Sequence, residues 1–242
     1  MTLQAWQAAI GQLVVRGGTP AAPAPALDSD ALTGEEARWL RGVADSAGFR
    51  VTCEVQRWWR DLRLRTAAPL TLASVPEAEA ERLLERYLDT QAATTQFFLA
   101  EAIRFLDWVL ADPAIAVPPH AGSIAAWERA RLRALLASPP APAERAPRVV
   151  QVASAATLVT FSAQPEQVLA ALVAGAPLPA PGAGRWDVLV VPGRPPRWRV
   201  VDDAEARLLA RCRAPQAVDA SCARGEDALI ARLLAEGGLA AG

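Results

Sequence analysis

The stretch WDVLVVPGRPPRWRVVD, residues 186–202, decides how the second half of this chain folds. Two runs rich in valine and tryptophan flank five residues, 192–196, of which three are proline and one is glycine. β-branched and aromatic residues favour strands, and a Pro/Gly cluster between two such runs favours a turn. The stretch therefore predicts a β-hairpin that turns at 192–196.

The segments around this hairpin predict a mixed domain. RVVQVASAATLVTF, 148–161, is β-branched and partly alternating, which predicts one strand or a tight pair. QPEQVLAALVAGA predicts a short helix, and DDAEARLLARC and EDALIARLLAEGGL predict two more, the first capped by one of its leading aspartates. Strands followed by a helix, a turn and a further helix are typical of a winged-helix-like domain.

The first part of the chain predicts a bundle of helices. Thr33 followed by Glu36 forms a capping-box pattern that opens a helix over 34–46. Apolar residues at i, i+3, i+4, i+7 and i+8 in EAEAERLLERYLDT predict a second helix. Further helices are expected over 2–16, 94–111 and 123–137, the last with Ser123 as its cap.

The stretch VTCEVQRWWRDLRLR, 51–65, has two contrasting faces when placed on a helix. At 100° per residue its valines, its tryptophans and Leu62 fall within one sector, and Arg57 and Arg60 fall on the other side. We expect the tryptophans to lie in the core and the arginines to form an outer face.

Two Pro/Ala-rich stretches, 17–26 and 138–147, predict linkers. The expected fold class is α+β, with an N-terminal helical bundle and a C-terminal winged-helix-like domain. The predicted organisation is an N-terminal helix and linker, a helical domain, a second linker and an α/β domain. These occupy residues 1–26, 27–137, 138–147 and 148–242.

Composition excludes several classes of function. The formal charge of −1 disfavours a general nucleic-acid binder, and the absence of a long apolar run or a signal peptide predicts a cytoplasmic protein without a membrane partner. With three cysteines and one histidine, the chain offers few side chains of the types that hold a metal ion. It also contains no nucleophile motif and no phosphate-binding motif. We therefore assign it no catalytic residue, no metal ligand and no cofactor of its own.

Four segments carry a resemblance to a known family. They are CEVQRWWRDLRLRTAAPLTL (53–72), PPHAGSIAAWERARLRA (118–134), LVTFSAQPEQVLAALVAGAPLP (158–179) and VLVVPGRPPRWRVVDDAEARLLARC (188–212). In this order they resemble the partner subunits of multinuclear non-haem iron-dependent oxidative enzymes, which modify cysteines of ribosomally made precursor peptides in methanobactin-like and thiaglutamate-like pathways.

The resemblance implies two partners for this chain. Iron would reside in a separate TIM-barrel oxidase, on which the helical domain would dock. The C-terminal domain would resemble a precursor-peptide recognition element and hold the peptide leader. An acidic patch on the barrel would suit the forked guanidinium groups of an arginine face. The residues predicted for docking are Arg57, Arg60, Arg63, Arg65 and His120.

A peptide can add to an exposed sheet edge as an extra strand, with backbone hydrogen bonds that supply affinity. The hairpin is the candidate edge. The residues predicted to bind the peptide are Trp186, Asp187, Val188, Leu189, Val190, Val191, Arg197, Trp198 and Arg199.

A DNA-binding regulator with a winged-helix-like domain is the alternative function. Such a domain would read bases with basic or amide side chains. EDALIARLLAEGG contains three acidic residues and one arginine, with neither Asn nor Gln, which disfavours this alternative. A stand-alone enzyme is the third and weakest hypothesis.

Overall fold

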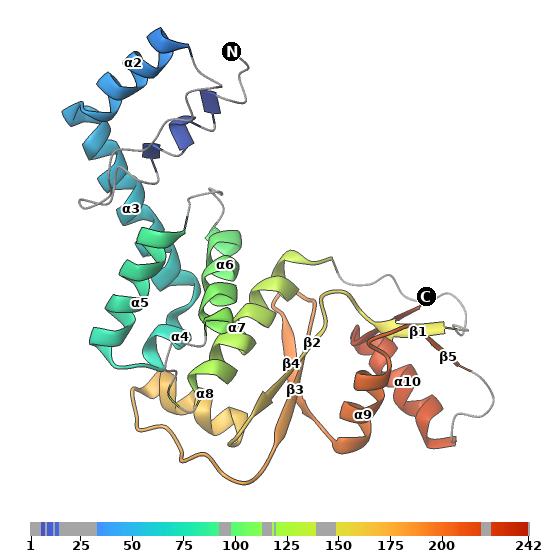
Figure 1. Ribbon diagram of the computed structural model, residues 1–242. Coiled ribbons are helices and arrows are strands. Elements are labelled where there is room, and N and C mark those ends of the chain that lie inside the picture. Colours follow the sequence, from blue (N-terminus) through green and yellow to red (C-terminus); the bar gives the residue numbers. More distant parts are fainter. Residues whose placement is uncertain are drawn as a thin grey trace. The chain divides into compact units, whose positions relative to one another are not determined.

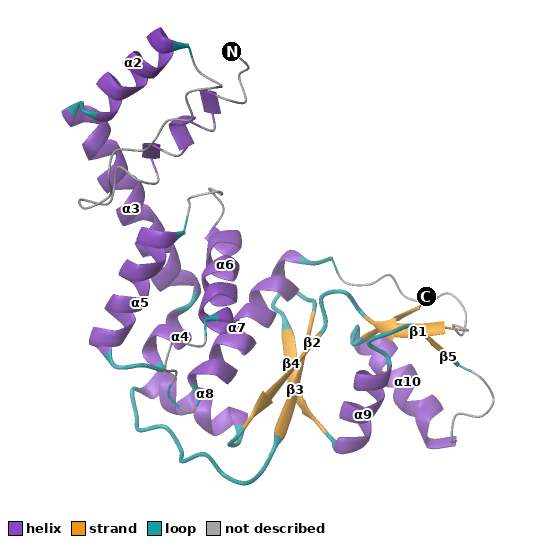
Figure 2. Ribbon diagram, in the orientation of Figure 1, coloured by secondary structure: helices purple, strands orange, loops and turns teal. Residues whose placement is uncertain are grey.

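The computed structural model describes residues 6–14 in part, 33–91, 98–112, 118, 120–138, 149–218 and 224–241. The chain forms two compact units (Figure 1). The first, mainly helical, comprises 1–69 and 76–105, and the second comprises 70–75 and 106–242. Helices and antiparallel sheets are mixed, which confirms the α+β class at this level (Figure 2).

A few large buried side chains hold the helices of the first unit together. Tyr87 and Phe105 lie at its centre with ring centroids 5.2 Å apart in an edge-to-face arrangement. Its elements are α2 (Gly34–Ala44), α3 (Ala47–Ala67), α5 (Glu77–Thr90) and the first part of α6 (Phe98–Ala111). The short α4 (Pro69–Ala73) and α6 each run across the boundary between the units.

Helix starts agree with the capping predictions in two of the three cases that can be examined. Thr33 caps α2 in a capping box with Glu36, as predicted. Asp202 caps α9 (Asp203–Arg211), also as predicted. The Ser123 prediction was wrong: α7 (Ala121–Leu136) begins earlier, with His120 at its N-cap, and the Ser123 hydroxyl donates to the Thr160 carbonyl instead. The predicted cap Thr2 lies outside the described residues.

Two three-stranded antiparallel sheets form the framework of the second unit. One has the order β5–β1–β6 and the other β2–β3–β4. The strands are β1 (Val149–Val152), β2 (Thr157–Phe161), β3 (Trp186–Val191), β4 (Arg197–Val201), β5 (Gln216–Ala217) and β6 (Leu239–Ala241). The predicted hairpin is confirmed, but β1 and β2 belong to different sheets and are not a tight pair.

Strand β3, at the centre of sheet β2–β3–β4, has helices on both sides (Figure 1). Val188 and Val190 of β3 pack with residues of α7 and α8 (Pro165–Ala174). Leu189 and Val191 point to the opposite face and pack with residues of α9 and α10 (Arg224–Glu236). The continuous valine run of β3 is typical of a strand covered on both sides.

The compact units divide the chain differently from the predicted domains. Helix α7, predicted to belong to the helical domain, packs on β2 and β3 through Ile124, Trp127 and Ala130. Small alanines on the packed side allow this close approach to the sheet. The predicted linker 138–147 lies almost entirely outside the described residues. Among the described residues, no helix is long and apolar enough to cross a membrane.

Candidate peptide-binding groove beside strand β4

Of the two predicted peptide-binding strands, only β4 has an edge without a partner strand among the described residues. Strand β3 pairs with β2 from Thr157↔Val190 to Phe161↔Trp186, and with β4 on its other side. Its backbone is therefore occupied along both edges. The prediction that Trp186–Val191 accept an added strand was wrong for this reason, and Val188–Val191 are core residues.

Strand β4 is an edge strand of its sheet, and its two faces differ sharply. Trp198 is half-buried on the α7 side, where its ring meets that of Trp127 edge to face at 5.8 Å. Arg197 and Arg199 project to the α10 side, because they stand opposite Val191 and Leu189 in the register. One face of β4 is thus aromatic and the other cationic.

Strand β4 also lines a groove of about 440 Å³. Two buried residues of β3, Leu189 and Val191, contribute apolar lining, and Glu236 at the end of α10 contributes a carboxylate. The complete lining is Leu189, Val191, Pro196, Arg197, Trp198, Arg199 and Glu236. Two arginines against one glutamate leave the lining with a net positive charge.

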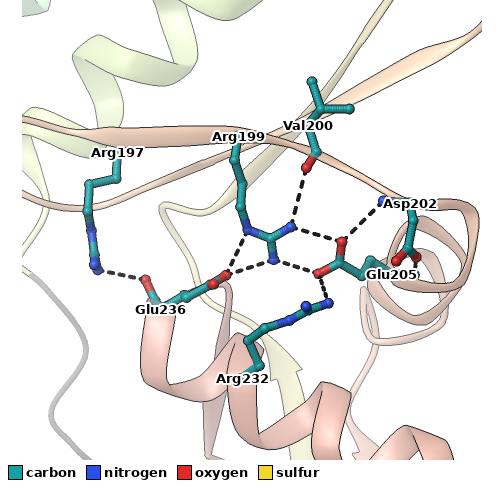
Figure 3. A network of polar contacts seen from close by, with 7 residues as sticks. All are labelled: Arg197, Arg199, Val200, Asp202, Glu205, Arg232 and Glu236. Carbon is teal, nitrogen blue, oxygen red and sulfur yellow. Dashed lines mark hydrogen bonds and ion pairs between the residues drawn. The ribbon is translucent and has the colours of Figure 1, made fainter.

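Arg199 is held by two carboxylates from two different helices (Figure 3). Its Nη1 and Nη2 donate to Glu205 of α9 at 2.8 and 2.5 Å, and its Nη2 and Nε donate to Glu236 of α10 at 2.8 and 3.1 Å. Arg232 donates to the same Glu205 at 2.6 Å. This network fastens β4 to both helices, and one wall of the groove is therefore rigid.

Glu205 is buried, yet it stays ionised. The hydrogen bonds from Arg199 lower the pKa of this carboxyl below its usual value of 4.5, against the opposing effect of burial. Its backbone N–H also binds the Asp202 carboxylate at 2.8 Å, and its own carboxylate accepts from the Asp202 N–H at 3.1 Å. Glu205 therefore both caps α9 and fixes Arg199.

Arg197 is the exposed cation of the groove. Its Nη2 donates to the backbone carbonyl of Glu236 at 3.0 Å, and no carboxylate contacts its guanidinium among the described residues. Arg197 can therefore bind a carboxylate of another molecule without breaking an ion pair of the chain.

Sequence reasoning missed the acidic half of this site. The pattern Asp202-x-x-Glu205 marks a helix start and could have located Glu205. Glu205 follows Arg199 by six residues, at the start of the helix that comes after β4. Glu236 is distant in the sequence and meets Arg199 only through the packing of β4 against α10.

The predicted docking residue Arg60 is not on the surface. Its side chain is buried, with 5% of the residue exposed, and donates to the fully buried Glu101 at 2.8 and 2.9 Å. It also donates to the Gln91 carbonyl at 2.9 Å and lies over the Tyr87 ring. The prediction that Arg60 faces a partner was wrong, because it is the buried electrostatic centre of the helical unit.

The other three arginines make contacts within the chain. Arg57 pairs with Asp89 at 2.6 Å. Arg65 pairs with Asp61 at 2.7 Å and with Glu81 at 2.6 Å, and these hydrogen bonds raise the pKa of its guanidinium. Arg63 lies over the Phe98 ring. All three would have to give up or share these contacts to bind an acidic partner.

The faces of α3 are reversed relative to the prediction. Cys53, Arg60 and Leu64 are the buried residues of this helix. The apolar sector faces outward, with 57% of Trp58 and 40% of Trp59 exposed. We call this sector the tryptophan stripe. It comprises Val51, Val55, Trp58, Trp59 and Leu62.

His120 is also buried, with 2% of the residue exposed. Its Nε2 lies 2.7 Å from the Pro179 carbonyl, which can only accept, so this nitrogen carries the proton. The histidine ties the start of α7 to the loop after α8 and cannot be a direct docking contact.

Among the described residues, no group of three or more His, Cys, Asp or Glu side chains is placed to hold a metal ion. Comparison with known proteins found no matching family model and no curated protein of significant sequence similarity.

Proposed function

We propose that this chain is a non-catalytic partner subunit that binds the leader of a ribosomally made precursor peptide and presents the peptide's cysteine to an iron-dependent TIM-barrel oxidase. The observation that carries the proposal is the groove lined by β4, which is an edge strand among the described strands of its sheet. An edge strand beside a groove with apolar lining and exposed charge is a common arrangement for binding an extended peptide. The family resemblance of the sequence supplies the identity of the peptide and of the oxidase.

The second compact unit supplies the recognition function in this proposal. A leader strand beside β4 would form backbone hydrogen bonds with the edge, and its side chains would alternate between the Trp198 face and the Arg197 face. The ion-pair network of Arg199 keeps that edge in place before the peptide arrives, which reduces the ordering cost of binding. Tethering the leader then raises the effective concentration of the cysteine at the oxidase.

The test uses a fluorescein-labelled synthetic leader of a cysteine-containing precursor peptide encoded beside this chain. We expect saturable binding by fluorescence anisotropy, and Arg197→Glu should weaken it about tenfold or more by reversing the exposed charge of the groove. Arg207→Glu, an exposed arginine of α9 outside the lining, is the matched control and should bind as the wild type does.

A second arm tests the oxidase. The chain is co-expressed with the barrel protein encoded beside it and purified by a tag on this chain alone, and iron is assayed in the product. Co-purification of an iron-containing barrel supports the proposal. A chain that purifies alone and binds duplex DNA but not the leader would overturn it in favour of the DNA-binding alternative.

A further inference from the structure

The tryptophan stripe on α3 contains none of the residues assigned above to the peptide or to the oxidase, and it lies on the surface of the helical unit. Its five side chains expose on the order of 400 Å² of apolar surface, of which the two tryptophans supply about half. The largest apolar patch on a typical monomer has about this size and is often an interaction site. No charged side chain interrupts the stripe between Val51 and Leu62 on the outward face of the helix.

The spacing of the stripe is symmetric about its own centre. Trp58 and Trp59 flank the midpoint, Val55 and Leu62 are equally far from it, and the next positions outward are Val51 and the exposed Thr66. A two-fold axis through this midpoint would place apolar side chains against apolar side chains, because each residue i then meets its counterpart j and each j meets i.

We propose that the tryptophan stripe is the interface of a homodimer, in which α3 packs antiparallel against α3 of a second copy. The two-fold axis passes between Trp58 and Trp59, so that the four tryptophans meet at the centre. Val55 of each copy then contacts Leu62 of the other. The inference is independent of peptide binding, which belongs to the second compact unit.

The area indicates how strong this dimer is. Two stripes bury on the order of 800 Å² of apolar surface, and their polar flanks bring the total close to the 1,000–1,200 Å² or so of the smallest specific interfaces. We expect a reversible dimer with a dissociation constant in the micromolar range. The small area limits the affinity, and the tryptophans at the centre supply most of it.

Sedimentation equilibrium of the full chain, from about 1 to about 100 µM, tests the proposal. We expect the wild type to shift from its monomer mass of 25.6 kDa towards twice that value as concentration rises. Val55→Glu alone and Leu62→Arg alone should each remain monomeric, because a charge would face an apolar side chain of the partner. Val55 and Leu62 are both exposed, so the variants should fold, and circular dichroism would check this.

The decisive sample is an equimolar mixture of Val55→Glu and Leu62→Arg, which should dimerise because the antiparallel register places the new glutamate opposite the new arginine. Val173→Glu, which changes an exposed valine of α8, is the matched control and should dimerise as the wild type does. A wild type that stays monomeric at every concentration would overturn the proposal. So would single variants that dimerise normally, or a mixture that stays monomeric.

Discussion

Two arginines, Arg60 in the helical unit and Arg199 in the sheet unit, are each held by carboxylates, but in different surroundings. Arg60 faces one carboxylate, Glu101, and both side chains are almost completely buried. Arg199 is one-third exposed and faces two carboxylates, one of which it shares with Arg232. Among the described residues no second carboxylate pairs with Arg60, whereas Arg199 belongs to a network in which other charges compensate.

The largest expected effect is therefore at Arg60. Arg60→Met leaves Glu101 as an uncompensated charge in the core, and we expect a loss of about 3–5 kcal/mol in the free energy of unfolding, measured by urea titration. Removing both charges, with Arg60→Met and Glu101→Leu together, should recover most of that loss. A loss below about 1 kcal/mol in the single variant would contradict the buried pair.

This expectation changes how the docking hypothesis is tested. If Arg57 and Arg60 both lay on the surface, reversing the two charges together would test docking directly. Because Arg60 is buried, its reversal would unfold the helical unit and would report on stability alone. Of these two arginines, only Arg57 is suitable for a surface test.

The next effect is at Glu205, in the shared network. Glu205→Gln removes the charge that binds Arg199 and Arg232, and we expect a loss of about 1.5–3 kcal/mol in the free energy of unfolding near neutral pH. The folded state lowers the pKa of this carboxyl, so its contribution is present above the unfolded value near 4.5 and is lost as the pH falls through the folded pKa. Urea titrations at several pH values should show the wild-type advantage shrinking in acid.

Glu128 should show the opposite dependence on pH. Its carboxylate accepts from the backbone N–H groups of Leu70 and Thr71 at 2.9 and 2.8 Å, and burial raises its pKa above 4.5. Where Glu128 is ionised, Glu128→Gln loses one acceptor for an N–H, worth about 1–2 kcal/mol, but it also removes the cost of a buried charge.

The raised pKa means that the contribution of Glu128 is full below the unfolded value of 4.5 and declines as the pH rises through the folded pKa. The wild-type advantage over Glu128→Gln should accordingly be smaller at about pH 7 than at about pH 4. An advantage that grows with pH, as for Glu205, would show that the backbone hydrogen bonds outweigh burial.

The contrast between the two units also shows what a sequence can predict. The hairpin followed from local chemistry, because the Pro/Gly cluster and the valine runs act within a few residues of each other. The separation of β1 and β2 into different sheets did not, because strand pairing depends on partners far along the chain. For α3 the pattern identified two faces correctly but gave the wrong one to the core.

The reversal on α3 has a physical cause that periodicity cannot reveal. An arginine face can be buried if the fold supplies a carboxylate, a carbonyl and an aromatic ring for it, and Glu101, Gln91 and Tyr87 do so for Arg60. Of the residues that line the groove, Arg197, Trp198 and Arg199 were singled out from the sequence, and Glu236 was found only in the structure. Long-range pairing decided both outcomes.

The smallest expected effect is at Arg57, whose ion pair lies at the surface and not in the core as that of Arg60 does. Its ion pair with Asp89 lies at the surface, where solvent screens the attraction and both side chains lose freedom on pairing. Arg57→Ala should lower the free energy of unfolding by less than about 1 kcal/mol, and raising the salt concentration should reduce even that difference. If Arg57→Ala were as damaging as Arg60→Met, burial would not be what separates the two arginines. A small effect would leave Arg57→Glu as a variant that probes partner docking in a chain that remains folded.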